Sequence, residues 1–180
     1  MNKNGPWEIK SSSTVFKNGF FEVIQDQVLQ PDGEPGTYAT VNIRPGVSVL
    51  PVDDEGYVYL IREFRYALGR DSVEAVAGAL RDGEQPEEAA RREVLEELGI
   101  SADEWTSLGQ IEEDTALVRS RGYLFLARGL SFGQPRQEKT EEIRTLKMSF
   151  EEAVRQVMDG VIVHSPSAVL ILKALLTIGD

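Results

Sequence analysis

Segments rich in β-branched and aromatic residues, separated by short polar turns, occupy most of the chain before residue 70. Partial alternation of apolar and polar positions within these segments predicts β-strands. Turns are indicated by Pro-Asp-Gly-Glu-Pro-Gly at 31–36 and by Asp-Asp-Glu-Gly at 53–56. The expected strands, together with those later in the chain, are 15–29, 38–44, 47–52, 56–66, 105–111, 123–130 and 143–148.

Residues 86–98 have the pattern of a helix. Pro86 suits a first helical turn, Glu87 and Glu88 suit the positive amino end, and Gly99 is a usual stop. Two more helices are expected near the carboxyl end, at 149–160 and from Ser165 onward. The apolar run of this last helix is too short to cross a bilayer, so we expect it to be buried.

The helix at 86–98 carries acidic residues beside its apolar ones. We expect an apolar stripe for the core, formed by Ala90, Val94, Leu95 and Leu98. Beside it stand the carboxylates of Glu93, Glu96 and Glu97. Like charges at such spacings weaken a helix by about 0.2–0.5 kcal/mol per pair, so they need compensation.

A cation is the simplest compensation for these carboxylates. Arg92 can neutralise part of the charge through Glu96 or Glu88, each four residues away. The remaining acids fit a hard divalent cation, Mg²⁺ or Mn²⁺, which takes carboxylate oxygens and leaves room for waters and phosphates. The alternative for such a cluster is a solvated acidic face on a surface helix.

Residues around this helix match a longer pattern. It reads Gly, five residues, Glu, seven residues, Arg-Glu, an aliphatic residue, any residue, Glu-Glu, any residue, Gly and an aliphatic residue. This is the Nudix box, and the chain therefore resembles the Nudix hydrolases. The matching residues are Gly78, Glu84, Arg92, Glu93, Val94, Glu96, Glu97, Gly99 and Ile100.

The resemblance implies a role for each of these positions. Glu93 and Glu97 are implied as the main metal ligands, with Glu96 as a further or water-mediated ligand and the carbonyl of Ala77 beside them. Arg92 would orient an acid, supported by Glu84. Gly78 and Gly99 would allow tight backbone bends.

Similarity extends from about residue 20 to about residue 172 and is greatest to the ADP-ribose pyrophosphatase and nucleoside-diphosphate-sugar branch. The stretches that carry it include PGVSVLPV, YLIREFRYALGRDSVEAVAGAL and LFLA. It implies an α+β Nudix fold, in which a mixed sheet is sandwiched between helices. A small N-terminal β subdomain at 1–44 would serve dimerisation and the substrate pocket, ahead of the hydrolase domain at 45–180. A homodimer is therefore expected.

The same resemblance implies further site residues. Arg65 aligns with an arginine that binds the substrate phosphates, and Glu74 with a glutamate that faces the metal and substrate. The general base is expected on the polar loop 131–142. Glu141 is the best candidate there, followed by Glu138 and Glu142, and a box glutamate is the alternative.

These features predict a Mg²⁺-dependent hydrolase that cleaves the diphosphate of a nucleoside diphosphate sugar, ADP-ribose or a relative. Departures from the ADP-ribose pattern, such as Val76 and Ala116 in place of prolines and His164 near the carboxyl end, favour a broader activity. A nucleotide sensor without turnover and a hydrolase of dinucleoside polyphosphates or nucleoside triphosphates are the alternatives. The intact set Arg92, Glu93, Glu96 and Glu97 favours catalysis.

Aromatic residues of the amino-terminal part are a second open question. Trp7, Phe16, Phe20 and Tyr38 can stack on a nucleobase, although aromatic residues in strands are more often core. We therefore expect them in the core. His164 is expected as a loop or capping residue.

Composition fits one enzyme acting on small molecules. The 180 residues are 41% hydrophobic, enough for a sizeable core, and their net charge of −11 disfavours long nucleic acid as a partner. With no Cys, a disulfide framework, a thiol nucleophile and a Cys-based zinc site are excluded. The absence of an apolar leader pattern and of a long apolar run predicts a cytoplasmic protein without membrane contact.

Overall fold

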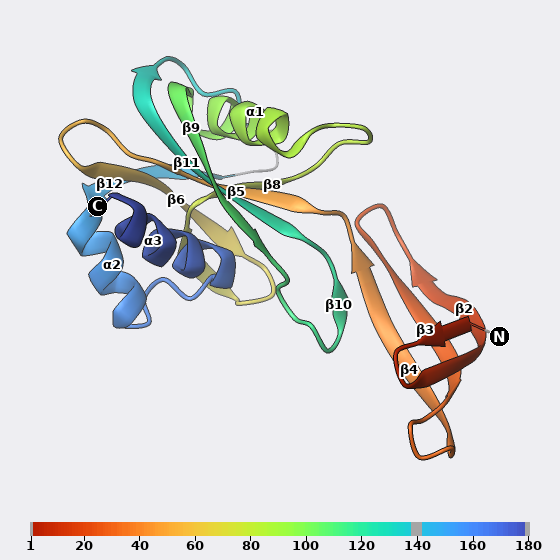
Figure 1. Cartoon of the computed structure of the whole chain (residues 1–180). Coiled ribbons are helices and arrows are strands. Elements are labelled where there is room, and N and C mark those ends of the chain that lie inside the picture. The colour runs from red at the N-terminus through yellow and green to blue at the C-terminus, as the bar shows by residue number, and fades with distance from the viewer. Residues whose placement is uncertain (1, 138–141, 179–180) are drawn as a thin grey trace. The chain divides into compact units, whose positions relative to one another are not determined.

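The computed structural model describes residues 2–137 and 142–178 (Figure 1). Its contacts divide the chain into two units. Unit 1 comprises Met1–Arg44 and Glu112–Arg121, and unit 2 comprises Pro45–Ile111 and Gly122–Asp180.

Unit 1 is a five-stranded sheet in the order β1-β2-β3-β4-β10. The first four strands pair antiparallel, whereas β10 pairs parallel to β4. The segment that contributes β10 therefore returns to this sheet from far along the sequence. The strand bounds are β1 Asn2–Asn4, β2 Trp7–Lys17, β3 Phe21–Leu29, β4 Pro35–Ile43 and β10 Val118–Arg119.

The strand expected at 15–29 is in fact two strands joined by a turn. The side chain of Asn18 accepts hydrogen bonds from the backbone N–H groups of Phe20 and Phe21, which closes the turn between β2 and β3. Asparagine and glycine favour such turns. The Ser-rich first half of β2 was not predicted, because its strand state depends on pairing with β3 rather than on its own pattern.

Unit 2 contains two sheets, in the orders β8-β5-β11-β9 and β12-β6-β7. Strands β5 and β11 pair parallel and the other pairs are antiparallel, so the arrangement is mixed. The strand bounds are β5 Gly46–Pro51, β6 Tyr57–Arg65, β7 Arg70–Glu74, β8 Val76–Ala79, β9 Ile100–Ile111, β11 Gly122–Phe132 and β12 Arg144–Ser149.

Helices cover both sides of these sheets, with α1 (Pro86–Leu98) on one side and α2 (Phe150–Met158) and α3 (Ser165–Ile178) on the other (Figure 1). Alternate residues of β5 show the two layers: Val49 packs in the cluster that contains α1, and Leu50 packs in the cluster that contains α3. Strands buried on both faces read as continuous apolar runs, as the sequences here do. The predicted α+β fold, with sheets between helices, is confirmed.

Helix α1 begins and ends at the predicted residues. Gly99 closes it with a left-handed backbone conformation, φ 66°. The apolar stripe was partly wrong: Leu95 is 46% exposed, whereas Glu97 is only 5% exposed. Glu97 lies seven residues, about two turns, after Ala90 and so shares its core-facing side, and Leu95 lies about 100° beyond Val94. A carboxylate thus enters the helix face that packs on the sheet.

Within the described residues, no helix combines the length and the apolar character needed to cross a membrane. Helix α3 instead buries Leu170, Ile171 and Ala174 against the sheet, as expected for its apolar run.

Candidate active site

Arg92 is the centre of a cluster of carboxylates on α1 and on the loop before it. Its guanidinium donates two hydrogen bonds to Glu84, from Nε to Oε1 at 2.7 Å and from Nη2 to Oε2 at 2.9 Å. Nη1 donates to Glu93 Oε1 at 2.6 Å and to Glu96 Oε2 at 3.2 Å. Nη2 also reaches the carbonyl of Ala79 at 3.2 Å. The planar guanidinium of Arg92 therefore orients Glu84, Glu93 and Glu96 and also contacts the end of β8.

These contacts shift the pKa values of Arg92 and of Glu84, which accepts two hydrogen bonds from it. The hydrogen bonds from Arg92 lower the pKa of Glu84 to about 2, despite partial burial. The pKa of Arg92 is raised well above its ordinary value, and the hydrogen bonds to Glu84 contribute most to this shift. Both groups are therefore charged at any physiological pH.

Arg92 was expected to bond Glu96 or Glu88, and only the Glu96 contact forms. Glu88 instead accepts the backbone N–H of Gln85 at 3.1 Å, at the start of the helix. An acid at this third position of a helix caps the free backbone groups of its first turn, which explains the difference. Arg81 supplies a second cation, with Nη2 3.4 Å from Glu96 Oε1.

Gly78 explains how Glu93 reaches the backbone of β8. A Cβ at Gly78 would lie 2.0 Å from Glu93 Oε1 and 2.1 Å from its Cδ, so the carboxylate occupies the space that a side chain would need. Ala77, the predicted carbonyl ligand, precedes Gly78 on the same half-buried strand. Both residues were predicted to belong to the site, which stays a prediction, and the structure gives a steric reason for the glycine.

Arg65 and Glu74 form a second ion pair on the neighbouring strands β6 and β7. Arg65 donates from Nε to Glu74 Oε1 at 3.1 Å and from Nη2 to Glu74 Oε2 at 2.6 Å, and its Nη1 lies 2.8 Å from Glu63 Oε2. Glu74 raises the pKa of Arg65 most, and the charge of Glu97 adds to this effect. Arg65, Glu74 and Glu97 thus belong to one electrostatic neighbourhood.

Glu74 is 2% exposed yet charged. Burial opposes its ionisation, but the hydrogen bonds from Arg65 and the nearby His164 outweigh this and lower the pKa of Glu74. His164 Nδ1 lies 3.5 Å from Glu74 Oε2 and 2.7 Å from Ser167 Oγ, at the start of α3. Sequence reasoning missed this link, because nothing local to His164 indicates the distant Glu74.

The polar loop after β11 is fixed to the end of α1. Arg136 donates its backbone N–H to the carbonyl of Glu96 at 2.7 Å, and Gln137 Nε2 donates to the carbonyl of Glu97 at 2.9 Å. Gly133 donates to the carbonyl of Gly99 at 2.7 Å, and a Cβ at Gly99 would meet Gly133 O at 2.6 Å. The loop therefore follows the backbone of the box helix closely.

Of the three predicted candidates for the general base, the structure describes Glu142. Glu138 and Glu141 lie outside the described residues. Glu142 is exposed and lines a small hollow of about 40 Å³ with the polar side chains of β6, β7 and β12. Its neighbours there are Arg62, Glu63, Phe64, Asp71 and Arg144.

Two of the predicted metal ligands, Glu93 and Glu96, are hydrogen-bonded to Arg92. Among residues 2–137 and 142–178, no group of three or more acids or histidines is spaced to hold a metal ion in the arrangement described. The donor types nevertheless fit a hard divalent cation: carboxylates of Glu93, Glu96 and Glu97 and a nearby backbone carbonyl. Because Gly78 has no side chain, the carboxylate of Glu93 lies directly against β8.

A mixed sheet between helices, with an arginine in the middle of one helix that is hydrogen-bonded to three carboxylates, is typical of the site of a hydrolase of Nudix fold. The comparisons agree. A family model described as "NUDIX domain" matches residues 42–166, and one described as "Nucleoside diphosphate sugar hydrolase N-terminal domain" matches residues 7–41. The chain therefore belongs to the Nudix family and is a Nudix hydrolase. Such hydrolases generally use divalent metal ions.

Two relatives illustrate the similarity. An ADP-ribose pyrophosphatase of Bacillus subtilis (strain 168) is 30% identical over 145 residues, 79% of this chain and 78% of that protein. An ADP-ribose pyrophosphatase of Mycobacterium tuberculosis (strain ATCC 25618 / H37Rv) is 32% identical over 162 residues, 88% of this chain and 78% of that protein. A crystal structure of an ADP compounds hydrolase has the same fold, with TM-score 0.81 and 20% identity, covering 93% of this chain and 91% of that one.

Gly78→Ala should displace Glu93 and leave the fold in place, because the clash involves the far end of a flexible side chain. We expect hydrolytic turnover to fall by about 10²-fold or more, as for other misplacements within a catalytic site, with a thermal midpoint near that of the parent. Steady-state kinetics and thermal unfolding measure the two effects. Gly19→Ala is the control, because a Cβ there meets nothing within 4 Å. Equal turnover in both variants would contradict the steric role.

Glu84→Gln should reduce stability in a pH-dependent manner. The folded-state pKa of Glu84, about 2, lies below its ordinary value of 4.5. Its pairing with Arg92 therefore stabilises the protein fully above about pH 4.5, and this contribution is lost as the pH falls towards about 2. Thermal unfolding at pH 7, 4.5 and 3 should show the parent and variant midpoints converging. A difference that stays constant over this range would argue against titration of the pair.

Proposed function

We propose that the chain is a Mg²⁺-dependent hydrolase that cleaves the diphosphate of a nucleoside diphosphate sugar, ADP-ribose or a related compound, into a nucleoside monophosphate and a sugar phosphate. The observation that carries this proposal is the Arg92 cluster, in which one guanidinium orients Glu84, Glu93 and Glu96 beside the buried Glu97. The names of the two ADP-ribose pyrophosphatases support the substrate class.

In this proposal Glu93 and Glu97 hold the cation, Glu96 is a further ligand, and the carbonyl of Ala77 completes the protein's donors. Mg²⁺ is the preferred ion and Mn²⁺ the alternative, since both take oxygen ligands. When bound, the ion supplies positive charge against the two phosphates. Arg92 orients the carboxylates of Glu93 and Glu96 through hydrogen bonds and so fixes the geometry of these ligands.

Arg65 binds the diphosphate in this proposal. Its guanidinium is partly exposed, with 36% of the side-chain surface accessible, and presents the planar fork suited to phosphate oxygens. Glu74, almost fully buried, fixes the other edge of that fork. The charge of Glu97 near Arg65 supports a shared site for metal and phosphate.

Glu141 is proposed as the general base, with Glu138 and Glu142 as the other candidates on the loop. The base takes a proton from water while the water oxygen attacks phosphorus, and the bridging P–O bond breaks to release the second phosphate. The hydrogen bonds of Arg136 and Gln137 to the Glu96 and Glu97 carbonyls support this loop as the source of the base. Closure of such a loop over substrate would exclude bulk water.

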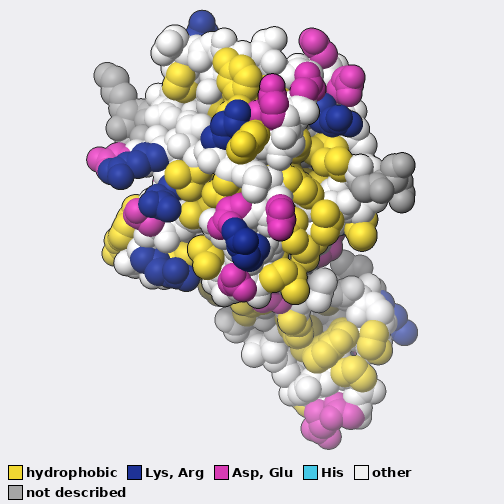
Figure 2. All heavy atoms as spheres, turned by 90° about the vertical axis from the view of Figure 1, so that its left-hand side faces the viewer, with side chains coloured by type: hydrophobic (Ala, Val, Ile, Leu, Met, Phe, Trp, Pro, Cys, Tyr) yellow, Lys and Arg dark blue, Asp and Glu magenta, His cyan; other side chains and the backbone are white. Residues whose placement is uncertain are grey.

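The remaining assignments are also proposals. Residues 1–44 are the subdomain that serves dimerisation and completes the substrate pocket, next to the hydrolase domain 45–180. A homodimer follows from the same resemblance, and a cytoplasmic location is proposed as well. On the face shown in Figure 2, acidic and basic side chains are interspersed with hydrophobic ones. This mixture, with the net charge of −11, suits a small-molecule substrate better than long nucleic acid.

Turnover with Mg²⁺ across ADP-ribose, ADP-glucose, UDP-glucose, GDP-mannose, diadenosine polyphosphates and nucleoside triphosphates tests this function. We expect metal-dependent cleavage of one or several diphosphate sugars, detected as phosphate after a phosphatase is added. Glu97→Gln should lower that turnover by orders of magnitude. Glu87→Gln on the same helix is the matched control, because Glu87 is exposed and forms an ion pair with Arg91. Near-normal turnover of Glu97→Gln at saturating Mg²⁺ would overturn the metal assignment.

Glu141→Gln should lower kcat far more than it raises KM, because a general base acts in the transition state. Glu138→Gln and Glu142→Gln are the comparison variants on the same loop. The proposal holds when only the first variant loses kcat and its pH profile loses the acidic limb. Unchanged kinetics in Glu141→Gln would transfer the role to another glutamate.

A further inference from the structure

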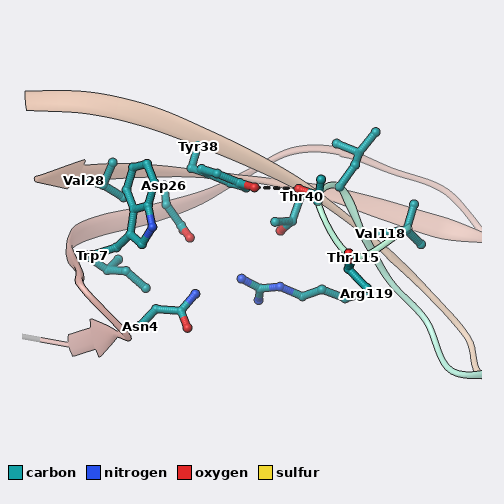
Figure 3. A pocket seen from close by; sticks show the side chains of 12 residues that line it. Asn4, Trp7, Asp26, Val28, Tyr38, Thr40, Thr115, Val118 and Arg119 are labelled. Carbon is teal, nitrogen blue, oxygen red and sulfur yellow. Dashed lines mark hydrogen bonds between the residues drawn. The ribbon is translucent and has the colours of Figure 1, made fainter. Parts of the chain in front are cut away.

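Unit 1 contains a cavity of about 230 Å³, and all of its lining residues belong to this unit (Figure 3). The rings of Trp7 and Tyr38 meet there edge to face, with centroids 5.4 Å apart. The aromatic residues of unit 1 were expected in the core, and that expectation was wrong: Tyr38 is 37% exposed, Phe16 is 50% exposed and Phe20 is 82% exposed. A single sheet has no second layer to bury them on both faces. None of the predicted site residues that the structure describes lines this cavity.

A second group of polar side chains, in unit 2, does include predicted site residues. Glu74 Oε1 accepts a hydrogen bond from Arg65 Nε at 3.1 Å, and Glu74 Oε2 accepts one from Arg65 Nη2 at 2.6 Å. Oε2 also lies 3.5 Å from His164 Nδ1. The carboxylate of Glu74 therefore contacts side chains of two other segments, β6 and the residue that precedes α3.

Arg65 reaches Glu74 by extending along the sheet. In the register of β6 and β7, Glu74 is opposite Ile61, whereas Arg65 is opposite Arg70 at the other end of the pair. Alternate residues of a strand share a face, so Arg65 and Glu74 lie on the same face of this sheet. The long arginine side chain must follow the strands to make its two bonds. The carboxylate of Glu74 therefore fixes where the guanidinium lies.

The start of α3 holds the chain at Glu74 through two contacts. Ser167 is fully buried, and its Oγ accepts the backbone N–H of Ala75 at 2.8 Å. His164 Nδ1 lies 2.7 Å from the same Oγ and 3.5 Å from Glu74 Oε2. The carbonyl of His164 accepts the backbone N–H of Ala168 at 3.0 Å, which ties His164 to the first turn of the helix. One contact thus fixes the backbone directly after Glu74, and the other orients its carboxylate.

We propose that His164 is a positioning residue for Arg65. From the start of α3 it orients the carboxylate of Glu74, and Glu74 in turn holds the guanidinium that binds the diphosphate. This role rests on the proposed function, in which Arg65 meets the phosphates. The contacts with Glu63 and Glu74 do not use every N–H group of the guanidinium, and the others face the phosphate oxygens. A guanidinium that is already oriented loses less freedom on binding, which raises its affinity for phosphate.

The burial of Glu74 makes its orientation depend on its protein partners. The side chain of Glu74 is 3% exposed, whereas those of His164 and Arg65 are 29% and 36% exposed. Water replaces a lost partner at an exposed carboxylate, but it has little access to a buried one. Loss of the His164 contact therefore moves the carboxylate of Glu74, and the guanidinium of Arg65 moves with it.

Substitution of His164, the single histidine of the chain, tests this role by steady-state kinetics. His164→Phe keeps an aromatic ring and removes Nδ1, whereas His164→Asn returns a side-chain nitrogen to nearly the same place. With the diphosphate sugar that the parent hydrolyses fastest, His164→Phe should raise KM about tenfold and leave kcat nearly unchanged, because the lost interaction serves binding. His164→Asn should restore most of the affinity. Val163→Ala is the control, because Val163 is adjacent and 44% exposed.

The Nε–H signal of Arg65 in nuclear magnetic resonance spectra reports the position of the guanidinium without any turnover. Its loss in Arg65→Lys identifies it. In the parent, where Nε donates to Glu74, we expect this proton to exchange slowly with water. In His164→Phe the signal should shift and exchange faster, and in His164→Asn it should resemble that of the parent. His164→Ala repeats the test with a smaller side chain if the phenylalanine variant does not fold.

The two measurements separate the possible outcomes. A lower thermal midpoint of His164→Phe with an unchanged Arg65 signal and an unchanged KM would show a merely structural role and overturn the proposal. A parent that hydrolyses no diphosphate compound would overturn the proposed function instead, and the Arg65 signal would still decide whether His164 positions the guanidinium.

Discussion

The bidentate bond between Arg92 and Glu84 is the interaction on which the candidate active site depends. With Glu84 fixed at the loop before α1, the free edge of the guanidinium faces Glu93 and Glu96 and offsets their mutual repulsion. A lysine would supply the charge but not the planar fork that reaches three acids and a carbonyl together. The helix can therefore carry an acidic face that would weaken it in isolation.

Close backbone approach is the second constraint, and it explains why two glycines belong to the same pattern as the acids. Glu93 fills the space of a missing side chain at Gly78, and the loop after β11 fills the space beside Gly99. Both contacts bring a strand or loop within bonding distance of α1. The residues of the long sequence pattern therefore contact one another in the fold. Arg92 neutralises the carboxylates, and glycine at position 78 leaves room for Glu93 beside the backbone of β8.

The parts of the fold that local chemistry determines were predictable. Helix α1 has the expected bounds because Pro86 and Gly99 act within one turn of its ends. The burial of Glu97 was not predicted, because the apolar pattern assigned the core-facing position to Leu95. In the helix, Glu97 faces the core and Leu95 is exposed. The link between His164 and Glu74 was also missed, as was the return of β10 to the first sheet. These depend on contacts between distant segments, which no local pattern encodes.

The buried carboxylates of Glu74 and Asp26 differ in their hydrogen-bond partners. Glu74 is almost fully buried, yet Arg65 and its neighbours compensate it within the protein. Asp26 is nearly as buried, and its Oδ1 has no partner among the described residues. A similar degree of burial thus leaves one carboxylate compensated by its neighbours and the other with an oxygen that lacks such a partner among the described residues.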